Sequence, residues 1–280
     1  MPKMIGCRPS GKYLRTTSGK IREISSWTFG HQHEGYVTER KVKTMTSRRQ
    51  FLAASAVFGA ASIGLLTTGR VLASSQEDRD RLSPADVINM MKDGNERFRR
   101  GLRVNRDFLR EQRERAAGQF PVAVILSCID SRAPAELIMD LGIGDVFNAR
   151  VAGNVPNPDI LGSLEFACHV AGAKVVLVLG HSSCGAIVGA IDGVELGQLT
   201  GLLSRIKPAV AETSYEGPRR SSDVAFVERV ARTNAERTIG AIRKESAILR
   251  ELEGNGAIAI AGAMYDLKTA TVSFLPPHEG

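Results

Sequence analysis

Two cysteines and one histidine closely follow two apolar runs of the chain, and together they could bind a metal ion. The run at 121–127 ends next to Cys128, and the run at 174–179 is followed by His181 and Cys184. Both runs are short and continuously apolar, as expected for strands that are covered on both faces. In open α/β sheets, ligands bind beyond the carboxyl ends of the strands. If the two strands are neighbours, these three side chains converge, and two thiolates with one imidazole form a zinc set that leaves a fourth position open.

An aspartate and an arginine lie beside the first of these cysteines. Asp130 comes two residues after Cys128, and Arg132 comes two residues after Asp130. A carboxylate at this spacing can either coordinate the metal or accept a hydrogen bond from metal-bound water. Arg132 can hold the carboxylate in a bidentate grip, which keeps it ionised and directs it away from the metal. We therefore expect a catalytic role for both side chains; the alternative is a structural ion pair near a turn.

The other cysteine of the folded part is not expected to bind the metal. Cys168 lies in a helical stretch between Ala167 and His169, which favours a buried structural role for the thiol, and His169 has no visible partner. The part of the chain after residue 73 contains three cysteines, and an odd number at scattered spacings does not make a disulfide framework. The absence of a Cys-x-x-Cys motif from the sequence argues against a thiol redox protein.

Strands alternate with helices along the chain, a pattern typical of an α/β fold. We expect a central, mostly parallel β-sheet of four strands plus an antiparallel edge strand, flanked by helices. The four strands are expected at 121–127, 145–152, 174–179 and 257–264, and the edge strand at 270–275. Helices are expected at 83–94, 103–115, 133–141, 159–171, 185–191, 200–212 and 223–252, the second of them charged and solvated. The sequence shows no internal repeat or low-complexity linker after residue 80, so we expect one domain over 74–280.

The positive charge of the chain lies in its first part. The sequence has 37 Lys and Arg against 30 Asp and Glu, a net charge of +7. Residues 1–73 contain 12 of the basic residues and only 3 of the acidic ones, so the remainder has a net charge of −2. This distribution argues against a nucleic-acid partner for the folded part.

Residues 1–73 have the pattern of an export leader. Arg48 and Arg49 precede an apolar stretch at 51–66, and small residues at 71–73 are suited to signal-peptidase cleavage. The stretch is too short and too weakly apolar for a stable membrane anchor. The paired arginines resemble the twin-arginine signal, which carries folded proteins and therefore suits a protein that takes up its cofactor first. We expect a periplasmic or secreted protein, with residues 1–44 the product of an over-long start; the alternative is an ordinary apolar helix behind two surface arginines.

The paired motifs resemble those of the β-class carbonic anhydrases. Cys-x-Asp-x-Arg at 128–132, followed along the chain by His-x-x-Cys-Gly at 181–185, carries the resemblance, which extends over 83–275. It implies one zinc ion per subunit, bound by Cys128, His181 and Cys184, with Asp130 and Arg132 as a dyad beside the zinc-bound water. It also implies a homodimer or a higher homo-oligomer, with the opening helices packed on the partner subunit. Three further residues then match substrate-pocket positions, namely Gln119, Phe147 and Gly185.

The activity implied by this resemblance is the reversible hydration of carbon dioxide to bicarbonate and a proton, by attack of zinc-bound hydroxide. Hydrolysis of carbonyl sulfide or carbon disulfide on the same scaffold is one alternative. A non-catalytic zinc-binding module, closed by Asp130 as a fourth ligand, is another, although Arg132 argues against permanent closure. Two positions depart from the family pattern: Val151 stands where many relatives have Asn, and Phe166 where some have Tyr. Substrate preference could differ at these positions.

Overall fold

The computed structural model describes residues 13–15, 21–23 and 75–276. Strands β1 (Tyr13–Arg15) and β2 (Ile21–Glu23) form a two-stranded sheet of their own. The paired arginines, the apolar stretch and the cleavage segment of the leader lie outside the described residues, so export and a boundary at residue 73 stay predictions. Within the described part of the chain, no helix combines the length and the hydropathy needed to cross a bilayer.

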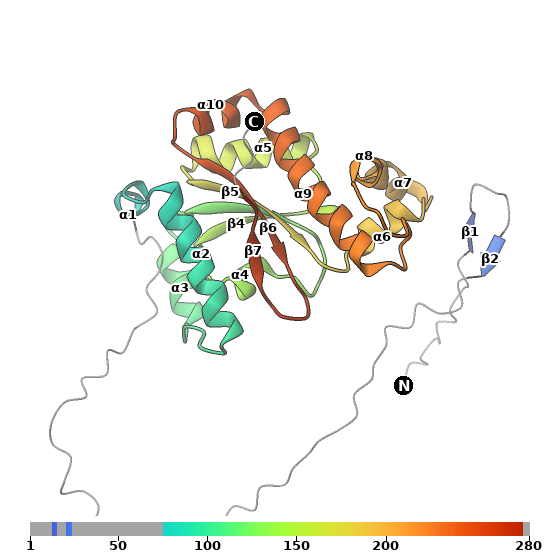
Figure 1. Ribbon diagram of the computed structural model, residues 1–280. Helices are drawn as coiled ribbons and strands as arrows, with labels where there is room; N and C mark the ends of the chain where they lie inside the picture. The colour runs from blue at the N-terminus through green and yellow to red at the C-terminus, as the bar shows by residue number, and fades with distance from the viewer. Residues whose placement is uncertain (1–12, 16–20, 24–74, 277–280) are drawn as a thin grey trace, which may run out of the picture. The chain divides into compact units, whose positions relative to one another are not determined.

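A five-stranded sheet organises residues 75–276. Its strand order is β4-β3-β5-β6-β7, and all neighbours are parallel except the antiparallel β6–β7 pair at the edge. This confirms the predicted α/β fold with four parallel strands and one antiparallel edge strand. Every residue of β3 and β5 is buried, because helices cover the sheet on both faces (Figure 1). The strands are β3 (Ala123–Ser127), β4 (Val146–Arg150), β5 (Val175–His181), β6 (Ala259–Tyr265) and β7 (Val272–Phe274).

Alternate side chains of the two central strands enter separate cores. Ile125 and Leu177 pack on one face with α2 (Pro84–Arg99) and α4 (Ala135–Ile138). Val124, Leu126, Val176 and Val178 pack on the other face with α5 (Pro158–Glu165), α9 (Val224–Glu245) and α10 (Ala247–Gly254). This two-sided burial explains why the strand sequences read as continuous apolar runs.

A third core lies beyond the carboxyl ends of the strands. It joins Cys128 and Cys184 to the first half of α9 and to three short helices: α6 (Gly185–Ile191), α7 (Gly197–Ser204) and α8 (Lys207–Glu212). The metal-ligand candidates therefore lie among packed apolar side chains, not in an open loop.

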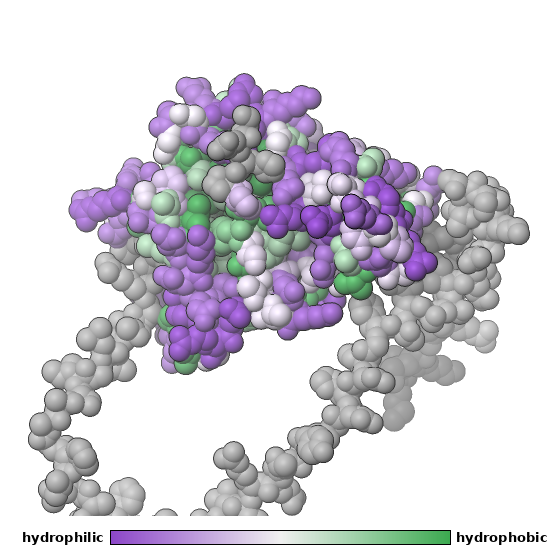
Figure 2. Space-filling view, in the orientation of Figure 1, coloured by the Kyte–Doolittle hydropathy of each residue, from purple (hydrophilic) through white to green (hydrophobic). Residues whose placement is uncertain are grey.

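Hydrophobic residues also gather between α2 and α9, over the β6–β7 edge (Figure 2). The outward surface of α2 is hydrophilic in the same view, as expected for a helix that buries one face. Residues lining this strip include Ile88, Ile239, Ile260, Phe274 and Leu275.

Several predicted helices are shorter or divided. The helix predicted at 223–252 breaks at Ser246, which ends α9 and caps α10 by accepting the Leu249 N–H, while its hydroxyl donates to Glu165. The helix predicted at 200–212 is divided into α7 and α8, and the latter has a proline in its first turn. The helix predicted at 133–141 shortens to α4, and that at 159–171 ends in the π-helix η2 (Phe166–Val170).

The remaining helices lie before the sheet in sequence. They are α1 (Gln76–Asp80), which Ser75 caps, α2 with its capping box at Ser83 and Asp86, and α3 (Phe108–Arg115). The prediction that 103–115 is one solvated helix is wrong in two respects: residues 103–107 are not helical, and several charged side chains of the segment are buried.

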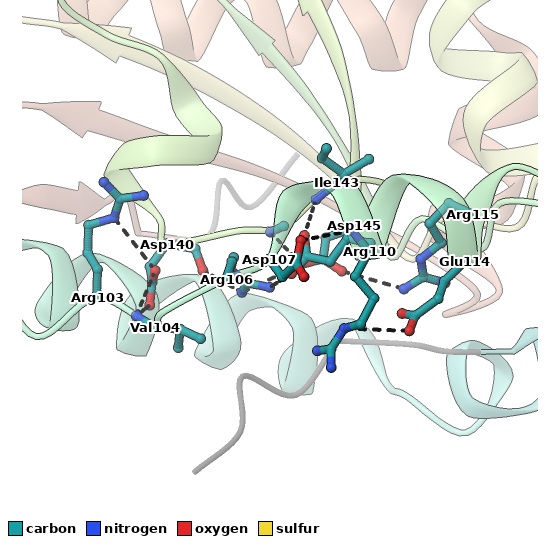
Figure 3. Close-up of polar contacts among 12 residues, drawn as sticks. Arg103, Val104, Arg106, Asp107, Arg110, Glu114, Arg115, Asp140, Ile143 and Asp145 are labelled. Carbon is teal, nitrogen blue, oxygen red and sulfur yellow. Dashed lines mark hydrogen bonds and ion pairs between the residues drawn. The ribbon is translucent and has the colours of Figure 1, made fainter. Parts of the chain in front are cut away.

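A charged network fixes the loop that leads into β4. Arg106 pairs with Glu111 at 3.1 Å, both side chains being nearly inaccessible to solvent, and Glu111 accepts the Ile143 N–H at 3.0 Å. Asp145 accepts the Gly142 N–H at 2.7 Å and lies 3.8 Å from Arg115 (Figure 3). These interactions set the position at which β4 begins.

Next to this network, Asp140 ties the same loop to the segment before α3. It pairs with Arg97 at 2.6 Å. It also lies 3.8 Å from Arg103 and accepts the Val104 N–H (Figure 3). Its carboxylate is fully buried, so both arginines compensate a charge that water does not reach.

We expect Glu111→Gln to lower the free energy of unfolding by roughly 3 kcal/mol, because it leaves the buried Arg106 charge without its closest partner. Glu114→Gln is the matched control, since Glu114 pairs with Arg110 one turn along the same helix but at the exposed surface (Figure 3). That control should change stability far less. Urea denaturation of the three proteins measures the difference, and equal effects of the two substitutions would contradict a structural role for the buried pair.

Candidate metal centre

The sheet topology brings the two predicted ligand segments together. Strands β3 and β5 are parallel neighbours, with Ser127 opposite Leu179. Cys128 follows β3 directly, His181 is the last residue of β5, and Cys184 caps α6. The expectation that the two strands are adjacent is therefore confirmed.

The three donor side chains are placed to bind one metal ion. Their ligand atoms all lie within 4.8 Å of one another, and all three residues are buried. The Sγ atoms of Cys128 and Cys184 are 3.9 Å apart. A disulfide would need about 2.05 Å, whereas two thiolates on a tetrahedral zinc with bonds of about 2.3 Å lie about 3.8 Å apart. The sulfur separation thus fits two ligands of one zinc-sized ion.

The histidine presents an unpaired nitrogen to this point. His181 Nδ1 lies 2.9 Å from the carbonyl oxygen of Ser182, which can only accept, so Nδ1 carries the proton. Nε2 is buried and has no hydrogen-bond partner among the described residues. A buried nitrogen with a free lone pair is costly unless something coordinates it, and a ligating histidine commonly donates its other N–H to a carbonyl in this way.

The thiol chemistry separates the two ligand cysteines from the third. A hydrogen bond from the Cys184 thiol is the main cause that lowers the pKa of Cys128, and the neighbouring Cys128 sulfur in turn raises the pKa of Cys184. In the absence of a cation the pair therefore favours one thiolate and one thiol. Cys168 lies apart on η2, and burial alone raises its pKa to about 12, as expected for a structural thiol.

Asp130 and Arg132 form the expected pair at the edge of the site. Arg132 Nε donates to Asp130 Oδ1 at 3.0 Å, and a terminal guanidinium nitrogen donates to Oδ2 at 2.7 Å. This bidentate contact is the main reason that the pKa of Asp130 falls to about 2. Asp130 Oδ2 lies 3.9 Å from His181 Nε2, so an ionised carboxylate stands beside the metal-facing nitrogen. Arg132 also reaches the Ser183 carbonyl, linking the two ligand loops.

A second arginine, which was not predicted as a site residue, supports the first ligand loop. Arg150 donates from Nε to the carbonyl of Cys128 at 2.8 Å and from a terminal nitrogen to the carbonyl of Asp130 at 2.5 Å. Its position opposite Ser127 in β4 makes both contacts possible. The sequence does show that Arg150 is a charged residue near the end of a predicted strand. It does not show the contacts of Arg150, because these are made to backbone carbonyls.

The predicted substrate-pocket residues do not all reach the ligands within one chain. Gly185 does, since it follows Cys184 and has open space where a side chain would begin. Phe147 lies opposite Val124, four residues before Cys128, which corresponds to about 13 Å along the strand. Gln119 is exposed and precedes β3, whereas Cys128 follows it.

Phe147 instead belongs to a separate hollow on the side of β4. Its ring makes an edge-on contact with that of Phe166, with centroids 6.1 Å apart, and Pro158 and Gly162 line the same hollow. Phe166 is half exposed. This aromatic surface lies along β4, the strand at the open edge of the sheet.

Comparisons with known proteins are consistent with the metal centre described above. The family model described as carbonic anhydrase matches residues 123–272, a segment that contains every ligand candidate and the Asp130–Arg132 pair. Carbonic anhydrase 2 of Mycobacterium tuberculosis is 35% identical over 191 residues, covering 66% of this chain and 89% of that protein. A carbonic anhydrase of Mycolicibacterium smegmatis is 31% identical over 200 residues, covering 71% of this chain and 96% of its own length.

Solved structures show the same fold. A tetrameric β-carbonic anhydrase of Sordaria macrospora is 25% identical with a TM-score of 0.55, over 69% of this chain and 95% of that one. A β-carbonic anhydrase of Aspergillus fumigatus is 26% identical with a TM-score of 0.54, over 70% and 91% of the two chains. Since the matched segment holds the ligand triplet as well as the sheet that positions it, the chain belongs to the β-class carbonic anhydrases and is an enzyme of that family.

Proposed function

We propose that the chain catalyses the zinc-dependent, reversible hydration of carbon dioxide to bicarbonate and a proton. The observation that carries the proposal is the buried triplet of Cys128, His181 and Cys184, beside a carboxylate that is held by an arginine. Two sulfur donors and one imidazole suit zinc better than the oxygen-seeking cations Mg²⁺ and Ca²⁺. The unpartnered Nε2 of His181 and the 3.9 Å sulfur separation fit such an ion.

Bound zinc supplies a Lewis acid that lowers the pKa of water far below its value in bulk solvent, as it does in carbonic anhydrases generally. Because Arg132 lowers the pKa of Asp130 to about 2, this carboxylate is ionised at neutral pH and would serve as a hydrogen-bond acceptor for water at the metal. Arg132 occupies both carboxylate oxygens, which restrains Asp130 from becoming a ligand itself. The space at Gly185 leaves room for a small, uncharged substrate beside Cys184.

The proposal includes assembly of at least two copies of the chain. Gln119 and Phe147 lie too far from the ligands to act within their own subunit, and Phe147 and Phe166 form an aromatic surface along the unpaired edge of β4. In a homodimer or larger homo-oligomer, that surface is covered and can bring Gln119 and Phe147 to the neighbouring subunit's site. The tetrameric state of the Sordaria macrospora relative supports this arrangement.

The direct test measures zinc per chain, native mass and carbon dioxide hydration on one preparation of the full chain. We expect about one zinc per subunit, a mass of at least a dimer, and hydration followed by a pH indicator. Cys128→Ser should lose both metal and activity, because it removes a thiolate ligand. Cys168→Ala, which changes the one cysteine of residues 75–276 that lies outside the site, should keep both.

Zinc-loaded protein with no hydration activity would overturn the proposed reaction, and a fully active monomer would overturn the assembly. Carbonyl sulfide is assayed in parallel. Faster hydrolysis of that compound than hydration of carbon dioxide would reassign the substrate while leaving the metal site intact.

We expect Arg132→Gln to retain zinc but lower kcat/KM by roughly tenfold or more, because the carboxylate of Asp130 loses the contacts that orient it. Stopped-flow hydration assays measure the rate, and metal analysis confirms the zinc content. Arg99→Gln is the matched control, since Arg99 forms an exposed ion pair with Glu96 on α2.

The effect of Arg132→Gln on the stability of the fold should depend on pH. The folded-state pKa of Asp130 lies near 2, below the value of about 3.9 for an unfolded chain. The Asp130–Arg132 pair therefore stabilises the fold above about pH 4, and this stabilisation is lost as the pH falls through 2. The difference in free energy of unfolding between metal-free wild type and Arg132→Gln should shrink between pH 4 and pH 2. A difference that stays constant over this range would contradict the account.

A further inference from the structure

A short turn behind the metal site connects it to the long helix α9. This turn is the 3-10 helix η1 (Ala152–Asn154), which follows β4. Its central residue, Gly153, has φ +71°, and a Cβ there would come within 2.6 Å of the Ile206 side chain. The positive φ favours glycine here, and a larger residue would also have to displace the Ile206 side chain at the start of α8.

The two ends of Gly153 make different contacts. Its N–H donates to Cys128 Sγ at 3.4 Å, in a buried position. Its carbonyl accepts a hydrogen bond of 2.7 Å from Asn234 Nδ2, on α9. One helical turn further along α9, Thr238 donates to the carbonyl of Asn154 at 3.2 Å. Asn234 and Thr238 are each only 2% exposed, so neither side chain has water as a substitute partner.

We propose that Asn234 is a positioning residue that tunes Cys128 as a metal ligand by fixing the Gly153 N–H against its sulfur. A hydrogen bond to a ligating thiolate withdraws negative charge from the sulfur and so changes how strongly the sulfur donates to the metal. Asn234 touches neither the ligand nor the reacting atoms, and its effect passes through one backbone residue. The inference rests on the proposed metal site, which it extends to a residue more than a hundred positions from Cys128 in sequence.

The rival interpretation is that Asn234 only stabilises the fold. Buried polar side chains ordinarily hydrogen-bond to buried carbonyls, and that alone would explain the contact. Thr238 separates the two interpretations, because it makes the same kind of bond from the same helix to the next carbonyl of the same turn. A purely structural contribution should be similar for both residues, whereas only Asn234 holds the residue that donates to the sulfur.

The experiment replaces the metal with Co²⁺ in the full chain and records the thiolate-to-cobalt charge-transfer band. In Asn234→Leu, which removes the donor at similar size, we expect this band to move to lower energy, because a sulfur without its hydrogen bond is more easily oxidised. The visible bands of tetrahedral Co²⁺ should remain. We also expect roughly tenfold weaker zinc binding in competition with a chelator, because Cys128 loses the contact that positions it as a ligand. Thr238→Val should leave the charge-transfer band in place.

An unchanged band in Asn234→Leu would overturn the inference, and so would an equal shift in Thr238→Val. If Asn234→Leu does not fold, Asn234→Ala removes the same donor without adding apolar bulk at the turn, and the same criteria apply. A wild-type protein that takes up Co²⁺ without any thiolate band would overturn the metal site itself. That outcome is distinct from a failure of the Asn234 proposal alone, in which the wild-type spectrum is normal.

Discussion

The parallel pairing of β3 with β5 is the constraint on which the site depends. Parallel strands end at the same edge of a sheet, and the register that places Ser127 opposite Leu179 brings Cys128 level with the end of β5. His181 is the last residue of β5 and Cys184 follows three residues later, so both lie close to Cys128. The packing of the apolar side chains in both strands therefore also fixes the positions of the candidate ligands. Little further backbone ordering is needed to form the site.

Electrostatics then decides what this cluster can do. A carboxylate next to two cysteines could close the coordination sphere of a metal, but both oxygens of Asp130 are taken by Arg132. Arg150 holds the backbone of the same loop, through the carbonyls on either side of Ile129. On the far side, the Gly153 N–H donates to the sulfur of Cys128, and Asn234 donates to the carbonyl of Gly153. Different parts of the chain therefore surround the candidate ligands, namely the loop that holds Arg132, strand β4 with Arg150, the turn η1 and the helix α9.

The sequence predicts those site residues whose type and position at a strand end indicate their role. Cys128, His181 and Cys184 were predictable because apolar runs locate the strands, and parallel topology brings their ends together. Arg150 and Asn234 were not, because they act on backbone carbonyls, and those acceptors are present at every position of a sequence. The break at Ser246 and the burial of Arg106 and Glu111 were missed for a related reason: each depends on a partner, such as Glu165 or the loop into β4, that lies elsewhere in the chain.

In the proposed site, three protein ligands hold one zinc ion while Asp130 stays outside the coordination sphere. X-ray absorption at the zinc edge tests it most directly, on the wild type and on Asp130→Asn at neutral pH. We expect the same spectrum for both proteins, with two sulfur atoms at about 2.3 Å and two nitrogen or oxygen atoms at about 2.0–2.1 Å. A first shell with fewer than two sulfur atoms, or one that changes when Asp130 is replaced, would contradict it.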